Sequence, residues 1–339
     1  MINVAINGFG RIGRRLYRLI DAYENMHVVA INDIADARTL SHLLKYDSIH
    51  GVYDKSISFD ADHIIVEGKK IKLFNQEHPS DINWQPYNVN FLIESTGKFK
   101  TSSDLAYHLK NGADRVILAV PPLDEDIKTV VLGVNEDILD GSETIISNAS
   151  CTTNNAAPMI DVINKLCKIK QAYITTIHSY TTDQSLHDQP HKDLRRARAA
   201  GQSIVPTTTG AAKALTKIFP ELSDVIGGCG IRVPVANGSL TDITFNVEET
   251  VSIDAINKAF KDASTKAQFK NILEYTEDPI VSIDIVGNIH SCIFDSQMTS
   301  VIGNMIKIVG WYDNETGYSS RILELICNLS DKSSLLSNK

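Results

Sequence analysis

The chain has 339 residues, of which 43% are hydrophobic and 22% are charged, so it is long enough to form two globular domains. Acidic residues outnumber basic ones by 41 to 33, and this balance argues against general binding to nucleic acid or to an anionic membrane. No apolar run approaches the ~20 residues of a membrane span, and no secretory signal pattern is visible.

Cysteine usage points to a reducing compartment. The five cysteines are odd in number, widely separated and never arranged as C-x-x-C: Cys151, Cys167, Cys229, Cys292 and Cys327. This pattern is typical of free thiols rather than of a disulfide framework or a zinc site. We therefore expect a cytoplasmic protein without a metal centre.

The chain begins with the pattern of a dinucleotide-binding fold. An apolar run over Ile2–Asn7 is followed by G-F-G-R-I-G at Gly8–Gly13, and then by helix-like apolar spacing over Arg14–Tyr23. A second apolar run covers His27–Asn32. The order of strand, glycine turn, helix and strand is the context in which this motif binds a dinucleotide.

Each part of that motif has a physical role. Gly8, Gly10 and Gly13 allow a tight turn and a close approach to a pyrophosphate, whose charge is met by the N-terminus of the helix. Asp33 comes about 20 residues after the last glycine, where a carboxylate accepts hydrogen bonds from ribose hydroxyls and repels a 2′-phosphate. The cofactor is therefore expected to be NAD rather than NADP.

Further strands and helices alternate through the first half of the chain. Strands are predicted at four places, Phe91–Glu94, Arg115–Val120, Val130–Val134 and Thr144–Ile146. A helix is predicted over Thr101–Asn111, and Tyr53–Pro86 is interpreted as a small insertion of strands and loops. Alternation of this kind predicts a parallel sheet covered by helices, with nucleotide-binding loops such as Ser95–Gly97 at the carboxyl ends of its strands.

A cysteine stands at the junction of a predicted strand and helix, in the stretch S-N-A-S-C-T-T-N-N at Ser147–Asn155. N–H groups in a first helical turn favour a thiolate, so Cys151 is expected to ionise more readily than a free cysteine. The alternative is a small, buried apolar residue without chemistry.

The second half has a different pattern. The strand Tyr173–Ile177 ends at His178, and a long polar segment from Ser179 to Gln202 precedes T-T-T-G at Thr207–Gly210, which opens a helix. Alternating strands are then predicted at Ile231–Val235, Leu240–Glu248, Ile280–Ile285, Ser291–Asp295 and Met305–Trp311, with helices at Ile253–Phe260 and Gly317–Leu329.

The predicted fold is α/β, with a Rossmann-type parallel sheet domain and an α+β catalytic domain built on a largely antiparallel sheet. The expected boundaries are 1–150 for the nucleotide-binding domain, completed by a C-terminal helix over 315–339, and 151–314 for the catalytic domain.

A cysteine nucleophile and a dinucleotide together suggest oxidation of an aldehyde through a thioester. His178 is the best candidate for the base, because an imidazole titrates near neutral pH. Several segments could bind anions, although each of their residues alone is more often a surface or capping residue. Thr181 and Asp183 follow His178, and the other candidates are Ser150, Thr152, Arg196, Thr209, Gly210 and Arg232. Two anion sites would serve a substrate phosphate and inorganic phosphate.

Longer motifs then identify a family resemblance. They are I-N-G-F-G-R-I-G-R, L-L-K-Y-D-S, S-N-A-S-C-T-T-N, H-K-D-L-R-R-A-R-A-A, P-T-T-T-G-A-A-K and W-Y-D-N-E-x-G-Y-S, in this order over nearly the whole chain. In these motifs the sequence resembles the phosphorylating glyceraldehyde-3-phosphate dehydrogenases.

The resemblance implies roles for individual residues. Cys151 would be the nucleophile, with His178 raising its reactivity and serving as base and then acid. The inorganic phosphate pocket would be lined by Ser150, Thr152, Thr209 and Gly210, and the substrate phosphate pocket by Thr181 and Arg232, with Arg196 between or near the two. NAD would be bound by Gly8, Gly10, Arg11, Ile12, Gly13, Asp33, Thr96, Gly97, Asn314 and Tyr318, with Asn314 fixing the nicotinamide carboxamide.

The resemblance also implies a homotetramer in which the segment 179–202 lies against neighbouring subunits. The chain departs from the family at four positions, where Asn155 replaces a second cysteine, Thr316 a tryptophan, Glu77 an arginine near the adenine, and Ala119 a hydroxyl residue near the nicotinamide. These departures bear on cofactor affinity and preference, and none of them removes a catalytic group.

Two rival functions remain open at this point. Erythrose-4-phosphate dehydrogenases share the nucleophile and the fold, but they differ in the segments that correspond to H-S-Y-T-T-D-Q and P-T-T-T-G-A-A-K. A non-catalytic nucleotide-binding paralogue would be expected to lose Cys151 or His178, and this chain keeps both. The sequence therefore favours glyceraldehyde 3-phosphate and inorganic phosphate as substrates.

Overall fold

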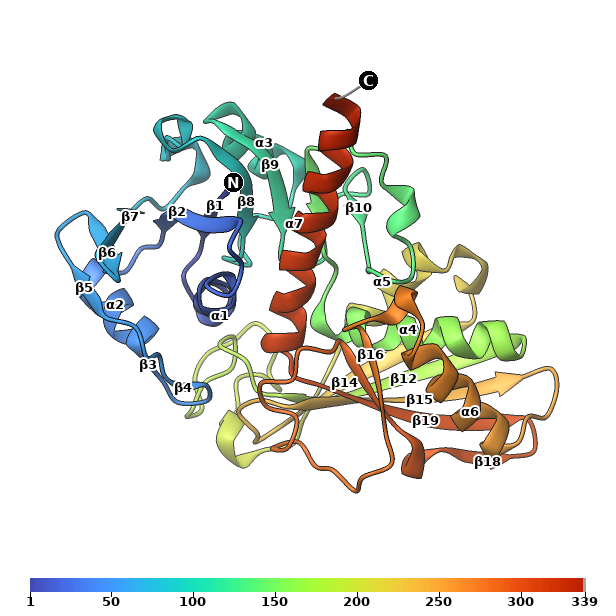
Figure 1. Cartoon of the computed structure of the whole chain (residues 1–339). Helices are drawn as coiled ribbons and strands as arrows, with labels where there is room; N and C mark the ends of the chain where they lie inside the picture. The colour runs from blue at the N-terminus through green and yellow to red at the C-terminus, as the bar shows by residue number, and fades with distance from the viewer. Residues whose placement is uncertain (338–339) are drawn as a thin grey trace. The chain divides into compact units, whose positions relative to one another are not determined.

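A computed structural model describes residues 1–337, and the chain divides into two compact units (Figure 1). The first unit comprises Met1–Val130, Asp137–Ala149 and the C-terminal segment from Ser319. The second unit comprises Val131–Glu136 and Ser150–Tyr318. Within residues 1–337, no helix has both the length and the apolar character that a membrane crossing requires.

The first unit is built on a nine-stranded sheet with the order β10-β11-β9-β8-β1-β2-β7-β6-β5. Neighbours from β10 to β7 are parallel, and β6 and β5 add an antiparallel edge. The strands are β1 (Ile2–Asn7), β2 (Met26–Asn32), β5 (Ile57–Phe59), β6 (His63–Val66), β7 (Lys69–Phe74), β8 (Val89–Glu94), β9 (Ala113–Leu118), β10 (Lys128–Thr129) and β11 (Ile145–Ser147). Strands β3 (Tyr46–Asp47) and β4 (Gly51–Val52) form a separate pair.

The helices of the first unit are α1 (Arg11–Ile20), α2 (Ala37–Lys45), α3 (Ser102–Lys110) and α7 (Thr316–Ser337), most of which belongs to this unit. One core cluster joins Ala5, Leu92 and Val116 of the sheet to Leu105 of α3. From β1 the chain runs outward to β2 and then returns to β8 on the other side of β1. The point between β1 and β8 is therefore the topological switch point, where open α/β sheets bind their ligands.

The second unit contains an eight-stranded sheet with the order β13-β14-β12-β15-β19-β17-β16, to which β18 adds by pairing with β19. The pairs β12–β14 and β16–β17 are parallel and the others are antiparallel. The strands are β12 (Ile169–Ser179), β13 (Val205–Thr207), β14 (Ile226–Val233), β15 (Ser239–Val247), β16 (Leu273–Thr276), β17 (Cys292–Asp295), β18 (Ser300–Ile302) and β19 (Met305–Tyr312). The helices are α4 (Cys151–Leu166), α5 (Ala211–Ile218) and α6 (Ile253–Ser264).

The predicted fold class is confirmed, because a mainly parallel sheet and a separate, largely antiparallel sheet are both present. Strands β5 to β7 show that the expected insertion at Tyr53–Pro86 in fact extends the first sheet. The last helix runs eight residues beyond the predicted end at Leu329, to Ser337, and residues 338 and 339 of the expected 315–339 helix lie outside the described residues.

Two predicted strands are wrong. Val130–Val134 follows the short strand β10 as a turn, since Gly133 has a φ of +81° and the Asn135 side chain accepts a hydrogen bond from the Val131 N–H. Ile280–Ile285 also forms turns, because the Asp284 carboxylate accepts a hydrogen bond from the Val281 N–H at 2.8 Å. In both segments, a hydrogen bond between a nearby side chain and the backbone takes the place of the strand-to-strand hydrogen bonds that the alternation of apolar residues predicts.

Candidate active site

The nucleophile candidate is the first residue of α4. Ser150 caps this helix, and its Oγ accepts a hydrogen bond from the Thr153 N–H at 3.1 Å. The Ser150 hydroxyl also lies 2.7 Å from the Thr153 hydroxyl, so it is engaged at the helix start. The cap explains why the S-C-T-T sequence starts a helix here and holds the Cys151 thiol at its positive end.

His178 faces this thiol from the end of β12. Its Nε2 lies 3.5 Å from the Cys151 Sγ, and the imidazole is buried with an exposed fraction of 6%. The parallel register of β12 and β14 places Arg232 directly opposite His178. The Arg232 Nη1 lies 2.5 Å from His178 Nδ1 and donates to the Ser179 carbonyl at 3.0 Å. Three residues from three elements thus meet at one point of the second unit.

Burial dominates the titration of the cysteine and the histidine. Burial raises the pKa of the Cys151 thiol, and Arg232 and the Thr152 backbone N–H lower it only in part. This corrects the expectation of a thiol more acidic than a free cysteine, because desolvation outweighs the helix terminus. Burial, and then the Arg232 charge, lowers the pKa of His178 to about 3. With these pKa shifts, the Cys151 thiol and the His178 imidazole are both neutral.

Tyr312 is a site residue to which the sequence analysis assigned no role. Its hydroxyl lies 2.8 Å from the Thr152 hydroxyl and 3.0 Å from the Thr176 hydroxyl. Its ring packs edge-on against the His178 imidazole, with the centroids 6.0 Å apart. The sequence feature that could have identified Tyr312 is its position in the W-Y-D-N-E motif. The Thr152 hydroxyl, predicted to face phosphate, instead bonds to this buried tyrosine.

The segment after His178 carries an ionic cluster. Asp183 accepts hydrogen bonds from the Thr181 hydroxyl and from the Arg196 guanidinium. Arg196 also lies 3.5 Å from the Asp193 carboxylate. Burial raises the pKa of Asp183, but the Thr181 hydroxyl and the charges of Arg196 and Arg232 outweigh it and leave the pKa lowered. Two arginines therefore act on this region, and Asp183 offsets part of their charge.

The second predicted anion cradle lies at the start of α5. Gly210 precedes this helix without a side-chain cap, and the Thr209 hydroxyl accepts a hydrogen bond from the Ala211 N–H at 3.2 Å. Gly210 is exposed and Thr209 is half-buried. A backbone turn of this kind can receive an anion, because it presents N–H groups at a positive helix end.

Asn314 and Tyr318 follow β19. The Asn314 Oδ1 accepts hydrogen bonds from the Ser179 hydroxyl at 2.8 Å and from the Ser239 hydroxyl at 3.0 Å. Tyr318 is buried, with an exposed fraction of 5%.

In the first unit, the glycine turn joins β1 to α1. Gly8 has a φ of +94°, and a Cβ there would lie 2.7 Å from the Thr96 backbone nitrogen. A Cβ on Gly13 would lie 2.2 Å from the Gly8 carbonyl oxygen, whereas one on Gly10 would meet no atom within 4 Å. The turn is therefore closed around Gly8 and Gly13 and open at Gly10, beside the N-terminus of α1.

The acid predicted to bind the ribose directly follows β2 and faces the same turn. Asp33 accepts hydrogen bonds from the Phe9 N–H at 2.7 Å and from the Ala35 N–H at 3.0 Å. Arg11, in the first turn of α1 with Ile12, makes a two-pronged ion pair with Asp47 at 2.8 and 3.2 Å. The Arg11 guanidinium is thus paired with Asp47. The groups of α1 that can bind a pyrophosphate are therefore the backbone N–H groups of its first turn.

Thr96 and Gly97 form the turn after β8. The Glu94 carboxylate accepts hydrogen bonds from the Thr96 N–H at 2.8 Å and from the Thr96 hydroxyl at 2.5 Å. Gly97 has a φ of +69°, which an L-residue rarely adopts. Together with the glycine turn and Asp33, this loop makes a backbone cradle at the switch point, and the cradle fits a dinucleotide.

Two family models match the chain. The model described as "Glyceraldehyde 3-phosphate dehydrogenase, NAD binding domain" matches residues 2–102, and the model described as "Glyceraldehyde 3-phosphate dehydrogenase, C-terminal domain" matches residues 150–314.

Curated relatives are similar over nearly the full length. Glyceraldehyde-3-phosphate dehydrogenase 2 of Streptomyces avermitilis is 50% identical over 96% of this chain and 97% of its own length. Glyceraldehyde-3-phosphate dehydrogenase 1 of Bacillus cereus is 46% identical, with 98% and 99% covered. The enzyme of Geobacillus stearothermophilus is also 46% identical, with the same coverage.

Proposed function

The chain belongs to the glyceraldehyde-3-phosphate dehydrogenase family, and on this premise we propose how its residues carry out the reaction. The activity is NAD-dependent, phosphorylating oxidation of glyceraldehyde 3-phosphate to 1,3-bisphosphoglycerate. Erythrose-4-phosphate dehydrogenase and a non-catalytic paralogue are not favoured, since the relatives at 46 to 50% identity are glyceraldehyde-3-phosphate dehydrogenases.

Cys151 is the proposed nucleophile and His178 its acid–base partner. The Cys151 sulfur forms a bond to the aldehyde carbon, while the thiol proton passes to His178 Nε2 and then to the aldehyde oxygen. Nε2 takes this hydroxyl proton back as a hydride leaves the carbon, and the product is a thioester. NAD, when bound, supplies the hydride acceptor. Inorganic phosphate then attacks the thioester carbon, and the sulfur leaves as a thiolate.

One observation carries this proposal. The 3.5 Å separation of Cys151 Sγ and His178 Nε2 is within reach of a proton transfer, and a proton on Nδ1 that is donated to the Ser179 carbonyl at 2.7 Å leaves Nε2 free to accept. Burial leaves both groups neutral in the structure, so the transfer to Nε2 creates the nucleophile at the moment of attack. Arg232 favours the thiolate that results, because its positive charge lowers the pKa of Cys151.

Two phosphate sites are part of the proposal. Arg232 and Thr181 would bind the substrate phosphate, with Arg196 beside them, because these side chains are gathered around Asp183. Thr209 and Gly210 would bind inorganic phosphate at the start of α5. The Ser150 and Thr152 hydroxyls have protein partners, so they would line that pocket while also holding the helix and Tyr312 in place.

The remaining assignments are proposals of the same kind. Residues 1–150 with the C-terminal helix would form the NAD-binding domain, and residues 151–314 the catalytic domain. NAD would lie against Gly8, Gly10, Arg11, Ile12, Gly13, Asp33, Thr96 and Gly97, with Asn314 and Tyr318 on the nicotinamide side. A homotetramer in the cytoplasm is supported by the family, and free thiols at all five cysteines are typical of a reducing compartment.

The test is phosphate-dependent reduction of NAD by the purified protein with glyceraldehyde 3-phosphate. Cys151→Ser is expected to abolish activity, and the matched variant Cys229→Ser is expected to retain it, because Cys229 lies on β14 three residues before Arg232 and bonds to Thr175 instead. Activity of Cys151→Ser equal to that of the wild type would overturn the proposed mechanism.

A further inference from the structure

Three adjacent strands of the first unit end in buried polar residues. Asn7 ends β1, Asn32 ends β2 and Glu94 ends β8, and the register places Asn7 directly beside both of the others. Their exposed fractions are 1%, 4% and 0%. Preceding positions of the same strands, such as Ile6 and Ile93, are aliphatic. A row of buried polar side chains therefore lies at the switch point, whereas the buried positions just before it in these strands are aliphatic.

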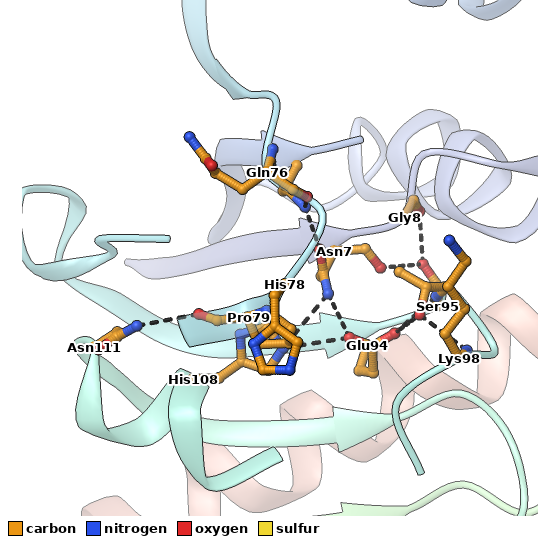
Figure 2. Close-up of polar contacts among 12 residues, drawn as sticks. Asn7, Gly8, Gln76, His78, Pro79, Glu94, Ser95, Lys98, His108 and Asn111 are labelled. Carbon is orange, nitrogen blue, oxygen red and sulfur yellow. Dashed lines mark hydrogen bonds and ion pairs between the residues drawn. The ribbon is translucent and has the colours of Figure 1, made fainter. Parts of the chain in front are cut away.

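The hydrogen bonds in this row have only one consistent direction. The Gln76 backbone N–H donates to Asn32 Oδ1, and Asn32 Nδ2 donates to the Gln76 carbonyl, so the Asn32 amide cannot be flipped. Asn32 Nδ2 also donates to Asn7 Oδ1 at 2.7 Å. Asn7 Nδ2 must then face Glu94, and it donates to Glu94 Oε2 at 2.5 Å. The chain of donors ends on the carboxylate (Figure 2).

His108 adds a further donor from α3. The Trp84 Nε1–H donates to His108 Nδ1 at 3.1 Å, and an indole nitrogen can only donate. His108 therefore carries its proton on Nε2 and is a neutral imidazole. This Nε2–H points at Glu94 Oε2, 3.3 Å away. Figure 2 shows Glu94 between His108 and the turn that carries Ser95 and Lys98.

Glu94 thus receives four donors. Oε2 accepts from Asn7 and His108, and Oε1 accepts from the N–H and the hydroxyl of Thr96. Only an ionised carboxylate accepts at every position, and no lysine or arginine side chain within residues 1–331 pairs with it. An apolar residue would be less costly to bury than this charge, so packing alone does not explain it.

The carboxylate connects to the cradle through Thr96. The Thr96 hydroxyl, held by Glu94, accepts a hydrogen bond from the Lys98 N–H at 3.1 Å. The Ser95 hydroxyl donates to the Gly8 carbonyl at 2.7 Å, and Gly8 has no room for a Cβ against the Thr96 nitrogen. A displacement of Thr96 would therefore displace the glycine turn.

We propose that Glu94 is a positioning residue for the dinucleotide: buried and bonded to Thr96, it fixes the 95–97 turn against the glycine turn, with His108 and Asn7 as its supports. It acts through the turn and not by contact with the cofactor. The proposal rests on the assignment of this cradle to NAD made under the proposed function.

The variant that tests it is Glu94→Gln, which keeps the shape but turns one acceptor oxygen into a donor among four donors. The dissociation constant for NAD, measured by calorimetry, is expected to rise about tenfold or more, because a buried donor then loses its partner. The KM for NAD should rise with it, while kcat and the KM for glyceraldehyde 3-phosphate change little. Glu94→Asp, which keeps the charge, should restore part of the affinity.

A matched control is Leu92→Val, a buried change on the same face of β8, two residues away. It should lower the unfolding temperature without changing the dissociation constant for NAD. If Glu94→Gln does not fold, Thr96→Val tests the same contact. It removes the hydroxyl that donates to Glu94 Oε1, and it should also weaken NAD binding. In the double variant the two effects should not add, because both break one link.

An unchanged dissociation constant in folded Glu94→Gln, or in Thr96→Val where Glu94→Gln does not fold, would overturn the proposal. Additive losses would overturn it too, because they would separate Glu94 from Thr96. A wild-type protein that binds no NAD would instead contradict the proposed function, so the two failures are distinct.

Discussion

Arg232 and His178 lie side by side in the parallel pair β12–β14, with Arg232 Nη1 2.5 Å from His178 Nδ1. Nδ1 is also 2.7 Å from the Ser179 carbonyl. It can donate its proton to that carbonyl, leaving Nε2 free to act as a base, or it can accept from Arg232, leaving an Nε2–H that faces the sulfur. The first tautomer can take the proton of the Cys151 thiol, whereas the second can only donate to the Cys151 sulfur, so the contact with Arg232 is coupled to the tautomer that faces Cys151.

Replacing Arg232 by glutamine is expected to raise the pKa of Cys151, because the arginine charge is the first of the influences that lower it. Alkylation of Cys151 by iodoacetamide should then be slower at neutral pH, and its pH midpoint should move upward. The KM for glyceraldehyde 3-phosphate should rise about tenfold or more, since a charge-assisted phosphate contact is lost. Arg195→Gln, an exposed arginine nearby, is the control. An unchanged alkylation profile would contradict the coupling.

The two glycines of the α1 turn should respond differently to alanine. Gly13→Ala places a Cβ 2.2 Å from the Gly8 carbonyl oxygen, so the backbone must move, and we expect a loss of about 1–3 kcal/mol in the free energy of unfolding. Gly10→Ala meets no atom within 4 Å and should unfold like the wild type. It should still weaken NAD binding, because its methyl group lies where the pyrophosphate would approach. Urea denaturation and calorimetry measure the two effects, and equal stability of both variants would refute the assignment.

Parts of the site could be predicted from the sequence because their signals are local. Each of three features depends only on residues that are close together in the sequence. They are the glycine turn, the helix beginning at Cys151 and the strand ending at His178. Ser150 caps α4 because a serine hydroxyl reaches the third N–H, which is a property of any helix start.

Other parts depend on tertiary structure. The contact of Arg232 with His178 comes from the register of β12 and β14, and no local pattern determines it. The pKa of Cys151 was predicted in the wrong direction, because the helix terminus is visible in the sequence and the extent of burial is not. Glu94 appeared only as the last residue of a predicted strand, since two of its four donors, on Asn7 and His108, come from other segments of the chain.

Replacing Asp33 by glycine is expected to relax the preference for NAD, because it removes the charge that opposes a 2′-phosphate. The ratio of kcat/KM for NAD to that for NADP should fall about tenfold or more. Asp33→Asn, which keeps an acceptor for the Phe9 N–H, should show the same change in preference with a smaller loss of stability. Asp60→Asn, an exposed carboxylate of the same unit, should leave the ratio unchanged. Equal ratios for all four proteins would count against the role of Asp33.

The buried imidazole of His178 should make the protein sensitive to acid. Its pKa is lowered to about 3 in the folded state from an ordinary value of 6.5, so below pH 6.5 the unfolded chain binds a proton that the folded chain does not. The free energy of unfolding should therefore fall as the pH falls below 6.5, by up to about 1.4 kcal/mol per pH unit from this group. His178→Asn should remove that contribution, whereas His187→Asn, at an exposed position, should keep it. Urea denaturation between pH 6.5 and about pH 5, where most carboxylates stay ionised, isolates the effect, and equal slopes for wild type and His178→Asn would disprove it.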